Sequence, residues 1–477
     1  MLEILTFDGV LTDANGAKLD VDCSVTLPVV SAAAAIVTIQ IPHVAAQHQE
    51  FQNPCTLRGK MGSQEVEINE LWYRKFPLGG TNRRLERGQL VINHIGLLKR
   101  RHDRIKHTEP SVLFLLSAVE FFKETTASAM TSYSSTPSQS IELFRIQTAD
   151  LGEIVFLKQW VVEHIKDGVI SANIHAGFYA QVICKSEDIK NVDFLVESFR
   201  EVLTVVSIFF RQAVDLLGWE VKSDTSTETV WLNPLKPYIA PYMPYEPHTF
   251  MVFPKEFKTC VNELVNKHLS CCKRIKKVIR NLSVSIAPHV RTDERDRFLN
   301  MFTALEFVVN LDKLTSDENH KLSETNAELI THLNRLKANI EAESSAFADK
   351  MIERVDGFVK TINSRSPSFS LKLESLFNSY PLLRSLTADL WPILGSAAKP
   401  GLKEIRDKIV HAKYDMVDTQ MLAVSSWHFS IFIERLIFVL AGAQVPESIC
   451  KNSFPLRREE WYSRDYWIAL QKFQKIA

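Results

Sequence analysis

The stretch Asn233–Pro254, NPLKPYIAPYMPYEPHTFMVFP, separates two parts of the chain with different sequence patterns. Prolines stand at positions 234, 237, 241, 244, 247 and 254. Because proline has no backbone N–H and interrupts helices and strands, this density predicts an ordered connector without regular structure. We therefore expect the main domain boundary here, with one domain over residues 1–250 and a second over residues 251–477.

The part before the connector carries strand-like patterns. Apolar and polar residues alternate in Ile36–Ile41, Glu65–Asn69 and Ser171–Lys185, which is typical of half-buried antiparallel strands. Asp193–Leu217 instead repeats its apolar residues at helical spacing and is followed by Gly218, a residue common just after helix ends. The sequence predicts a β-rich N-terminal domain with this helix covering one face of the sheet.

The part after Pro254 is helical almost throughout. Apolar residues recur at intervals of three and four, and the short connections favour antiparallel packing. The predicted fold class is α+β, a β-rich N-terminal domain followed by an all-α helical bundle. The expected helices cover residues 256–282, 293–311, 320–359 as a pair or one long helix, 369–380, 383–394, a segment from 399, and 416–442.

Composition excludes several classes of function. Lys+Arg and Asp+Glu both number 56, so contact with a polyanion has to come from a local patch. The seven cysteines include no CxxC pair and no cluster with histidine, so we expect reduced thiols and no metal. We also find no phosphate-binding glycine loop or nucleophile elbow, and we expect no cofactor.

The chain also lacks clear targeting signals. Its start, MLEILTFDG, has neither the basic region nor the long apolar region of a signal peptide. The longest apolar run, Phe429–Val445, is interrupted by Glu434 and Arg435, which argues against a membrane span. The sequence therefore predicts a cytoplasmic protein that does not contact a membrane.

Two basic segments each allow two interpretations. Residues 83–107 hold eight Lys and Arg against Glu86 and Asp103, which suits either a phosphate-tracking surface or a solvated rim beside an acidic neighbour. Residues 273–280 either form a nucleic-acid edge or place cations at the C-terminus of the helix over 256–282, and we favour the second interpretation. The cations of this second segment are Lys273, Arg274, Lys276, Lys277 and Arg280.

The candidate catalytic residues lie in the segment 399–415, KPGLKEIRDKIVHAKYD, whose pattern predicts an amphipathic helix. Lys403/Asp407 and Glu404/Lys408 are charge pairs at i,i+4 spacing. Arg406 and His411 form an R-x4-H pair in which the arginine suits phosphate and the histidine suits proton transfer.

The two residues of this pair point apart on a straight helix. At 100° per residue their directions differ by about 140°, whereas Asp407 and His411 share a face. Either the helix ends or bends near His411, or a second copy related by a two-fold axis supplies its own pair. We favour the dimer, in which two arginines hold the phosphate and two histidines share the acid and base roles.

A carboxylate on the helix over 293–311 is a candidate partner for this arginine. Glu306 falls between Leu299 and Phe302 on the apolar side of that helix. A carboxylate in an apolar environment needs a partner, and Arg406 flanks the apolar stripe of its own helix. The alternative is that Glu306 reaches water at the edge of the stripe.

Taken together, Ala304-Leu305-Glu306 on an early helix and R-D-x-x-x-H on a later one, in an all-helical C-terminal domain, resemble the HEPN ribonuclease superfamily. The β-rich domain before it, and the stretches IRDKIVHAKYD and SSWHFSIFIERLIFVLAG, are similar to the ApeA-type anti-phage proteins within that superfamily.

The resemblance implies a metal-independent endoribonuclease of abortive infection, a form of anti-phage defence. Arg406 and His411 would be catalytic, Asp407 would orient them, and Glu306 would support them. Transfer RNA is one candidate substrate, a phage-derived trigger would activate the enzyme, and the N-terminal domain would sense or restrain. A homodimer or higher homo-oligomer is expected. The alternative is a catalytically inactive HEPN-like module that binds RNA, a nucleotide or a protein.

Overall fold

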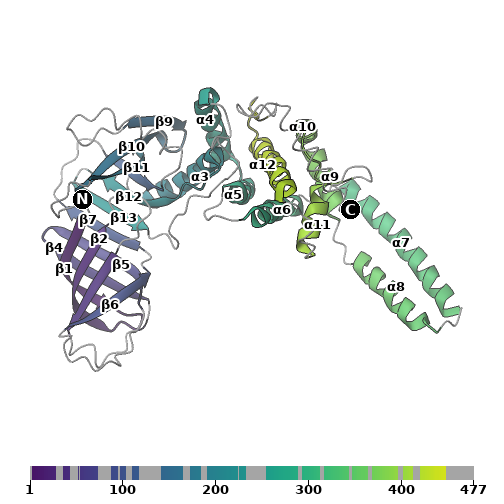
Figure 1. Ribbon diagram of the computed structural model, residues 1–477, viewed down its shortest axis with the longest axis horizontal. Helices are drawn as coiled ribbons and strands as arrows, with labels where there is room; N and C mark the ends of the chain where they lie inside the picture. Colours follow the sequence, from purple (N-terminus) through teal and green to yellow (C-terminus); the bar gives the residue numbers. More distant parts are fainter. Residues whose placement is uncertain are drawn as a thin grey trace. The chain divides into compact units, whose positions relative to one another are not determined.

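The computed structural model describes most of the chain and divides into two compact units, Met1–Thr292 and Asp293–Ala477 (Figure 1). The residues described are 3–27, 36–42, 52, 54–73, 87–94, 97–103, 110–117, 141–164, 172–183, 191–223, 225–232, 254–287, 293–311, 316–342, 346–363, 368–395, 401–411, 419–446 and 449. The proline-rich connector at 233–253 lies outside them.

The first unit is built on an antiparallel sheet of thirteen strands. These are β1 (Glu3–Thr12), β2 (Lys18–Leu27), β3 (Ile36–Pro42), β4 (Cys55–Met61), β5 (Gln64–Tyr73), β6 (Arg87–His94), β7 (Leu97–Asp103), β8 (Ser111–Leu116), β9 (Ile141–Thr148), β10 (Gly152–His164), β11 (Ala172–Ile183), β12 (Leu216–Lys222) and β13 (Ser226–Leu232). The alternating segments predicted as strands lie in β3, β5 and β11, which confirms them.

Six of these strands pair in a closed ring, in the order β1, β2, β3, β6, β5, β4 and back to β1. Inward-facing apolar side chains such as Leu5, Phe7 and Leu57 fill its interior. The first part of β5 also pairs with β7, and its end pairs with β6. Glu70 has φ 55 between these two parts, and this local irregularity lets one strand serve two neighbours.

Beyond β7 the sheet continues through β13, β12, β8, β11, β10 and β9, and helix α3 (Val192–Phe210) packs on it. The ring of Phe199 stacks on Phe114 of β8 with 3.9 Å between ring centroids. The expected helix over Asp193–Leu217 is therefore confirmed in place but wrong in its end.

α3 ends at Phe210 because Arg211 adopts a left-handed backbone conformation and closes the last turn. The hydroxyl of Ser207 accepts the N–H of Val214 in the chain that follows. Gly218 is not a helix cap but a strand residue, where an added Cβ would lie 2.3 Å from the carbonyl oxygen of Val230. Glycine is needed there for the close approach of β12 and β13.

The single helix expected over 256–282 is two helices, α4 (Pro254–Ser270) and α5 (Lys273–Ile286), separated where Cys272 is extended. Both belong to the first unit and not to the helical bundle. The physical reason is their packing, since the ring of Phe257 on α4 lies against Phe144 of β9 and Phe209 of α3. The units therefore divide after Thr292, whereas the sequence places the boundary near residue 250.

The regular elements that the structure describes in the second unit are all helices: α6 (Glu294–Leu311), α7 (Ser316–Ala342), α8 (Ala348–Asn363), α9 (Phe369–Ser379), α10 (Pro381–Leu386), α11 (Leu402–Val410) and α12 (Thr419–Ala441). The α+β fold class is confirmed. The core forms where α6, α9 and α12 meet, with the ring of Phe302 5.4 Å from Phe429 and 5.5 Å from Phe369. α7 and α8 are the expected pair, and α10 ends earlier than predicted.

Helix α12 is the central helix of this unit, and it includes a segment, Leu422–Ala441, long and apolar enough to cross a membrane. The most apolar part of this segment is 78% buried inside the protein, as in a core helix. Arg435 on α12 is fully buried and bonds both carboxylate oxygens of Asp389 at 2.6 and 3.1 Å. His428 accepts the backbone N–H of Trp391 at 3.0 Å.

Candidate functional site

Helix α11, which carries the R-x4-H pair, is fixed at its start by backbone contacts. Its first two N–H groups, of Leu402 and Lys403, donate to the carbonyl oxygens of Pro392 and Ile393 at 2.9 Å each. The N–H of Gly401 donates to the Glu404 carboxylate at 2.6 Å. These bonds satisfy N–H groups that have no partner within a helix, and they attach α11 to the chain segment before it.

One face of α11 is buried and the adjacent edge is half-buried. Leu402, Ile405 and Ile409 are at most 2% exposed and pack toward α6 and α12. Since these residues follow helical spacing, Arg406 and Asp407 are left at the border between core and solvent. The side chains of these two residues are 30% and 31% exposed. The chain thus places a cation and a carboxylate where a solute can reach them.

The Arg406 guanidinium is held on three sides. One terminal nitrogen, Nη2, donates to Oε1 of Glu306 on α6 at 2.9 Å, and Nη1 donates to Oδ1 of Asp407 at 2.9 Å. The centre of the guanidinium lies 5.7 Å from the ring centroid of Phe302, within the range of a cation–π contact. Among the residues that the structure describes, these contacts leave Nε–H and one N–H on each terminal nitrogen for a ligand.

Asp407 joins two cations of the same helix. Its second oxygen accepts from Nζ of Lys403 at 2.6 Å, so the predicted Lys403/Asp407 pair is present. Burial of the Asp407 carboxylate raises its pKa, but hydrogen bonds and positive charges from Lys403 and Arg406 outweigh this effect. The pKa of Asp407 therefore lies below its ordinary value of 3.8. The carboxylate remains ionised near neutral pH and orients the guanidinium as an anion.

His411 directly follows the last residue of α11 and is exposed. Its backbone N–H still donates to the carbonyl oxygen of Asp407 at 3.0 Å, so its Cα remains on the helical track. The helix ends near His411, in agreement with one of the two alternatives from the sequence. The Cα of His411 nevertheless lies on the same side of the helix as Asp407. Residues 412–418 lie outside the described part of the chain.

The structure thus confirms the predicted contact between Glu306 and Arg406, and Glu306 is 32% exposed beside it. The sequence placed Phe302 beside Glu306 but did not indicate its contact with Arg406, although the i,i+4 spacing of Phe302 and Glu306 on α6 was a usable signal. It also missed Gly395 and Gly401, whose backbones approach so closely that a Cβ on Gly401 would lie 2.3 Å from Gly395 N. The catalytic roles of Arg406, His411 and Asp407 stay predictions.

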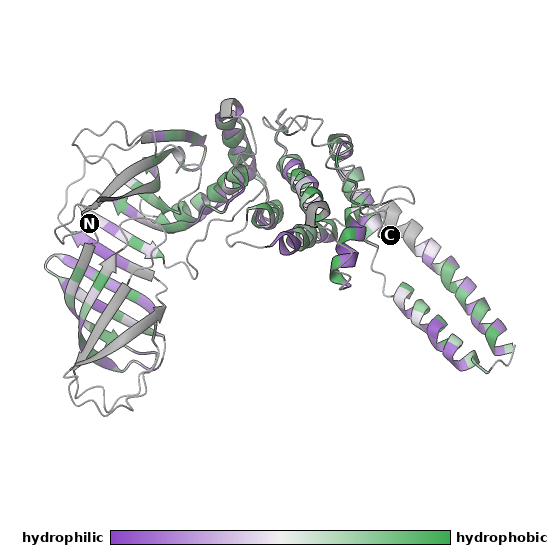
Figure 2. Cartoon of the chain, in the orientation of Figure 1, coloured by the Kyte–Doolittle hydropathy of each residue, from purple (hydrophilic) through white to green (hydrophobic). Residues whose placement is uncertain are grey.

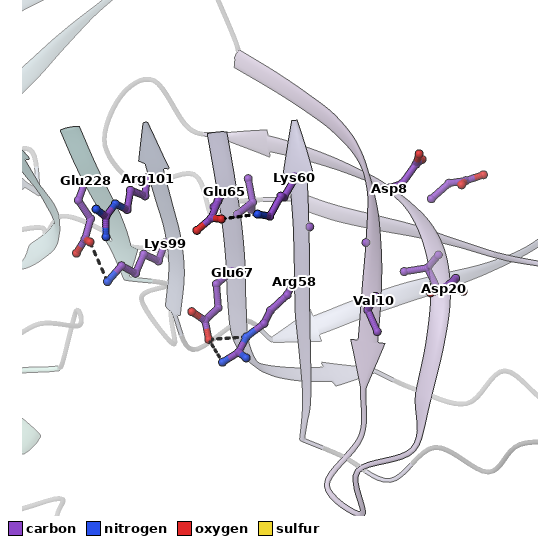
Figure 3. A pocket seen from close by; sticks show the side chains of 15 residues that line it. Asp8, Val10, Asp20, Arg58, Lys60, Glu65, Glu67, Lys99, Arg101 and Glu228 are labelled. Atoms are coloured by element: carbon purple, nitrogen blue, oxygen red, sulfur yellow. Dashed lines mark hydrogen bonds and ion pairs between the residues drawn. The ribbon is translucent and has the colours of Figure 1, made fainter. Parts of the chain in front are cut away.

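A second candidate is a groove of about 930 Å³ on the outer face of the first unit (Figure 3). Charged side chains cross it in register from strand to strand, with carboxylates and cations alternating over most of its width. The ion pairs along these rows are Arg58–Glu67 at 2.8 Å, Lys60–Glu65 at 2.7 Å and Lys99–Glu228 at 2.9 Å.

These pairs test the two interpretations of residues 83–107 at Lys99 and Arg101. Lys99 on β7 is neutralised by Glu228 of the neighbouring strand, and Arg101 stands opposite Glu65 and Glu228 in the strand register. A cation placed between carboxylates is a poor partner for phosphate. For these two residues the structure favours the rim beside acidic neighbours, while the side chains of residues 83–87 and 104–107 lie outside the described part.

The cations at 273–280 do not lie at a helix C-terminus, so that interpretation is wrong. Lys273 and Arg274 occupy the first turn of α5, which contains no acidic residue. Arg280 pairs with Glu201 of α3, the carboxylate that also contacts His268 on α4 at 2.8 Å. Arg280 therefore helps to join α3, α4 and α5, and the nucleic-acid edge stays a prediction for the exposed cations of the first turn.

No protein-family model matches the chain, and neither a curated protein nor a solved structure shows significant similarity to it. The resemblance to HEPN ribonucleases therefore rests on the motif residues themselves. Within the described ranges, no three His, Cys, Asp or Glu side chains form a group suited to a metal ion.

Proposed function

We propose that the second unit is a metal-independent endoribonuclease whose catalytic residues are Arg406 and His411, and that it acts in anti-phage defence as HEPN-like, ApeA-like proteins do. The observation that carries the proposal is the guanidinium of Arg406. It is oriented by Glu306 and Asp407 and backed by Phe302, and three of its N–H donors make no bond to a described residue. The exposed His411 follows five residues later.

The chemistry follows from these groups. His411 removes the proton of a ribose 2′-OH, or protonates the leaving 5′-oxygen, and Arg406 stabilises negative charge on the pentacoordinate phosphorus. The 2′-oxygen attacks the adjacent phosphorus and the P–O5′ bond breaks. The products are a 2′,3′-cyclic phosphate and a 5′-OH end. DNA lacks the 2′-OH and is expected to resist cleavage.

Asp407 and Glu306 act as positioning residues in this scheme. Arg406 and Lys403 carry two positive charges, and Glu306 and Asp407 carry two negative charges, so these four side chains are balanced. The balance keeps the guanidinium stable in a half-buried position without a bound phosphate. A homodimer would bring a second R-x4-H pair to the same phosphate, and the first unit would sense the trigger.

The test compares purified wild-type protein with Arg406→Ala and His411→Ala on transfer RNA, ribosomal RNA and single-stranded DNA. Both substitutions are expected to lower RNA cleavage by at least about 100-fold, with the cyclic phosphate as the product end. Arg384→Ala is the matched control, because Arg384 also pairs with a glutamate, Glu374, and lies 5.2 Å from the Phe377 ring. Equal cleavage by all variants would refute the proposal.

One observation favours a second function, a catalytically inactive module that binds RNA, a nucleotide or a protein. Both hydrogen bonds that Arg406 makes with the described residues go to carboxylates, and one joins α6 to α11, as in a purely structural contact. The hypothesis of an inactive binding module predicts RNA binding without cleavage by the wild-type protein. It also predicts a lower melting temperature for Arg406→Ala and no change in the RNA ends.

A further inference from the structure

Helices α7 and α8 form an antiparallel hairpin, and their main contacts are with each other (Figure 1). Ile340 on α7 and Val355 on α8 are each 5% exposed at the contact between them. Nζ of Lys337 lies 2.9 Å from Oδ1 of Asp356, which fixes the height at which the helices face each other. The surfaces with which α7 and α8 face each other are therefore already packed within the chain.

A second set of apolar side chains on the same hairpin is exposed. Leu329 and Leu336 on α7 are 45% and 47% exposed, and Met351 and Phe358 on α8 are 45% and 61% exposed. Each pair is seven residues apart, the spacing of side chains that form a continuous seam between packed helices. Figure 2 shows apolar residues on both helices.

These exposed side chains lie on one face of the hairpin. At 100° per residue, Leu329 and Leu336 are displaced by about 70° from the stripe of α7 that faces α8. Met351 and Phe358 are displaced by the same angle, in the same rotational sense, from the stripe of α8 that faces α7. Because the helices run in opposite directions, equal displacements fall on the same side of the pair.

The opposite face has a different character. The corresponding positions there are exposed and polar or small, namely Ala327, Asn334, Ala338, Asp349, Glu353 and Lys360. A hairpin that only has to remain in water has no need for one apolar face and one polar face. The asymmetry indicates that the apolar face, defined by Leu329, Leu336, Met351 and Phe358, is covered by another surface.

We propose that the apolar face of the α7–α8 hairpin binds the same face of a second copy of this chain, to form a four-helix bundle. A two-fold axis parallel to the helices places α7 of one copy over α8 of the other, in antiparallel orientation. The Lys337–Asp356 contact sets the height, so Leu336 lies within about one turn of Phe358 of the other copy.

This arrangement is self-complementary. Leu336 of one copy lies at nearly the same height as Phe358 of the other, so an aliphatic side chain meets an aromatic ring there. The two-fold axis repeats this contact on its other side, as an interface between identical surfaces requires. The inference is independent of the proposed ribonuclease activity, because its residues do not belong to the R-x4-H site.

The first test measures the mass of the full chain by sedimentation velocity at concentrations from nanomolar to tens of micromolar. The wild-type protein is expected to form dimers, and Leu336→Glu combined with Phe358→Glu is expected to weaken dimerisation at least about tenfold. Ala338→Glu is the control, since it adds the same charge on the polar face of the same helix. A monomeric wild-type protein, or a double variant that still forms dimers as the wild type does, would overturn the proposal.

A second test does not depend on how the glutamate variant folds. Chains with Leu336→Cys are mixed with chains carrying Phe358→Cys under mild oxidation, and cross-linked peptides are identified by mass spectrometry. The proposed interface is expected to yield a disulfide between the two different chains, above the background of the wild-type cysteines. Dimers without this cross-link would show that another surface joins the copies, which would also overturn the proposal.

Discussion

Replacing Gly401 with alanine is expected to destabilise the second unit by several kcal/mol. The new Cβ would lie 2.3 Å from Gly395 N, 2.6 Å from the Leu394 carbonyl carbon and 2.7 Å from the Ile393 oxygen. All three are backbone atoms, so α11 or the segment before it has to move. Overpacking of this kind costs about 1–3 kcal/mol. Losing the two backbone bonds at the start of α11 adds about 0.5–1.5 kcal/mol each.

The sum is about 2–6 kcal/mol, which corresponds to roughly 5–20 °C in the melting temperature of a unit of this size. Gly357→Ala is the control. Gly357 lies inside α8, an added Cβ there meets nothing within 4 Å, and alanine should stabilise the helix by about 0.5–1 kcal/mol. Scanning calorimetry of the full chain and hydrogen exchange over residues 402–411 provide the measurement. Equal stability of Gly401→Ala and the parent would refute the close contact.

Three further predictions concern single side chains. Glu306→Gln keeps an acceptor for Arg406 and should retain kcat on RNA within about threefold, whereas Glu306→Ala should lower kcat about 10–100-fold; the positioning role fails if both variants have the same kcat. Burial, with a smaller effect of the Arg435 charge, lowers the pKa of His428 from 6.5 to about 3, so the unfolded state binds the extra proton between these values. The contribution of His428 to the free energy of unfolding should be fully present above about pH 6.5 and fall toward pH 3 by about 1.4 kcal/mol per pH unit. His428→Asn should remove this slope in urea titrations. An unchanged slope would contradict the assignment. Lys273→Glu places an anion in the first turn of α5 and should stabilise the first unit by about 0.3–1 kcal/mol in thermal melts, and a loss of stability would count against the dipole argument.

The strands and helices that the sequence located best are those whose periodicity reflects one buried face. The end of α3 shows where this signal stops. Val214 and Leu217 continue the apolar spacing of the helix, so the sequence extends it to Leu217. What ends the helix at Phe210 is tertiary, because Arg211 is left-handed and the hydroxyl of Ser207 accepts the Val214 N–H. The spacing of apolar residues gives no information about the backbone conformation of Arg211 or the bond between Ser207 and Val214.

The two compact units divide later in the chain than the domain boundary expected from the sequence, for a related reason. The apolar face of α4 is visible in the sequence, but periodicity does not say which element it covers, and Phe257 packs against β9 and α3. The contact between Glu306 and Arg406 was predictable because a carboxylate on an apolar stripe needs a cation. The close approach of Gly395 and Gly401 was not, since two glycines near each other in the sequence carry no information about backbone distance.

Whether the active site needs residues from a second copy can be tested separately from the catalytic roles of Arg406 and His411. His411 keeps the helical bond from its N–H to Asp407, so its Cα lies about 140° from the direction of Arg406 around the helix. If a composite site uses Arg406 of one copy and His411 of the other, mixing Arg406→Ala chains with His411→Ala chains should restore cleavage. After random exchange about half of the dimers are mixed, and each holds one site with both groups.

The RNA cleavage rate of the mixture, compared with that of each variant alone, measures this rescue. Repeating the mixture with Leu336→Glu and Phe358→Glu in both chains tests whether the hairpin brings the copies together. Rescue that persists in that background would mean that the active sites meet without the hairpin. If the mixture shows no rescue although mixed dimers are detected by mass, each copy holds its own complete site, and the composite arrangement is wrong.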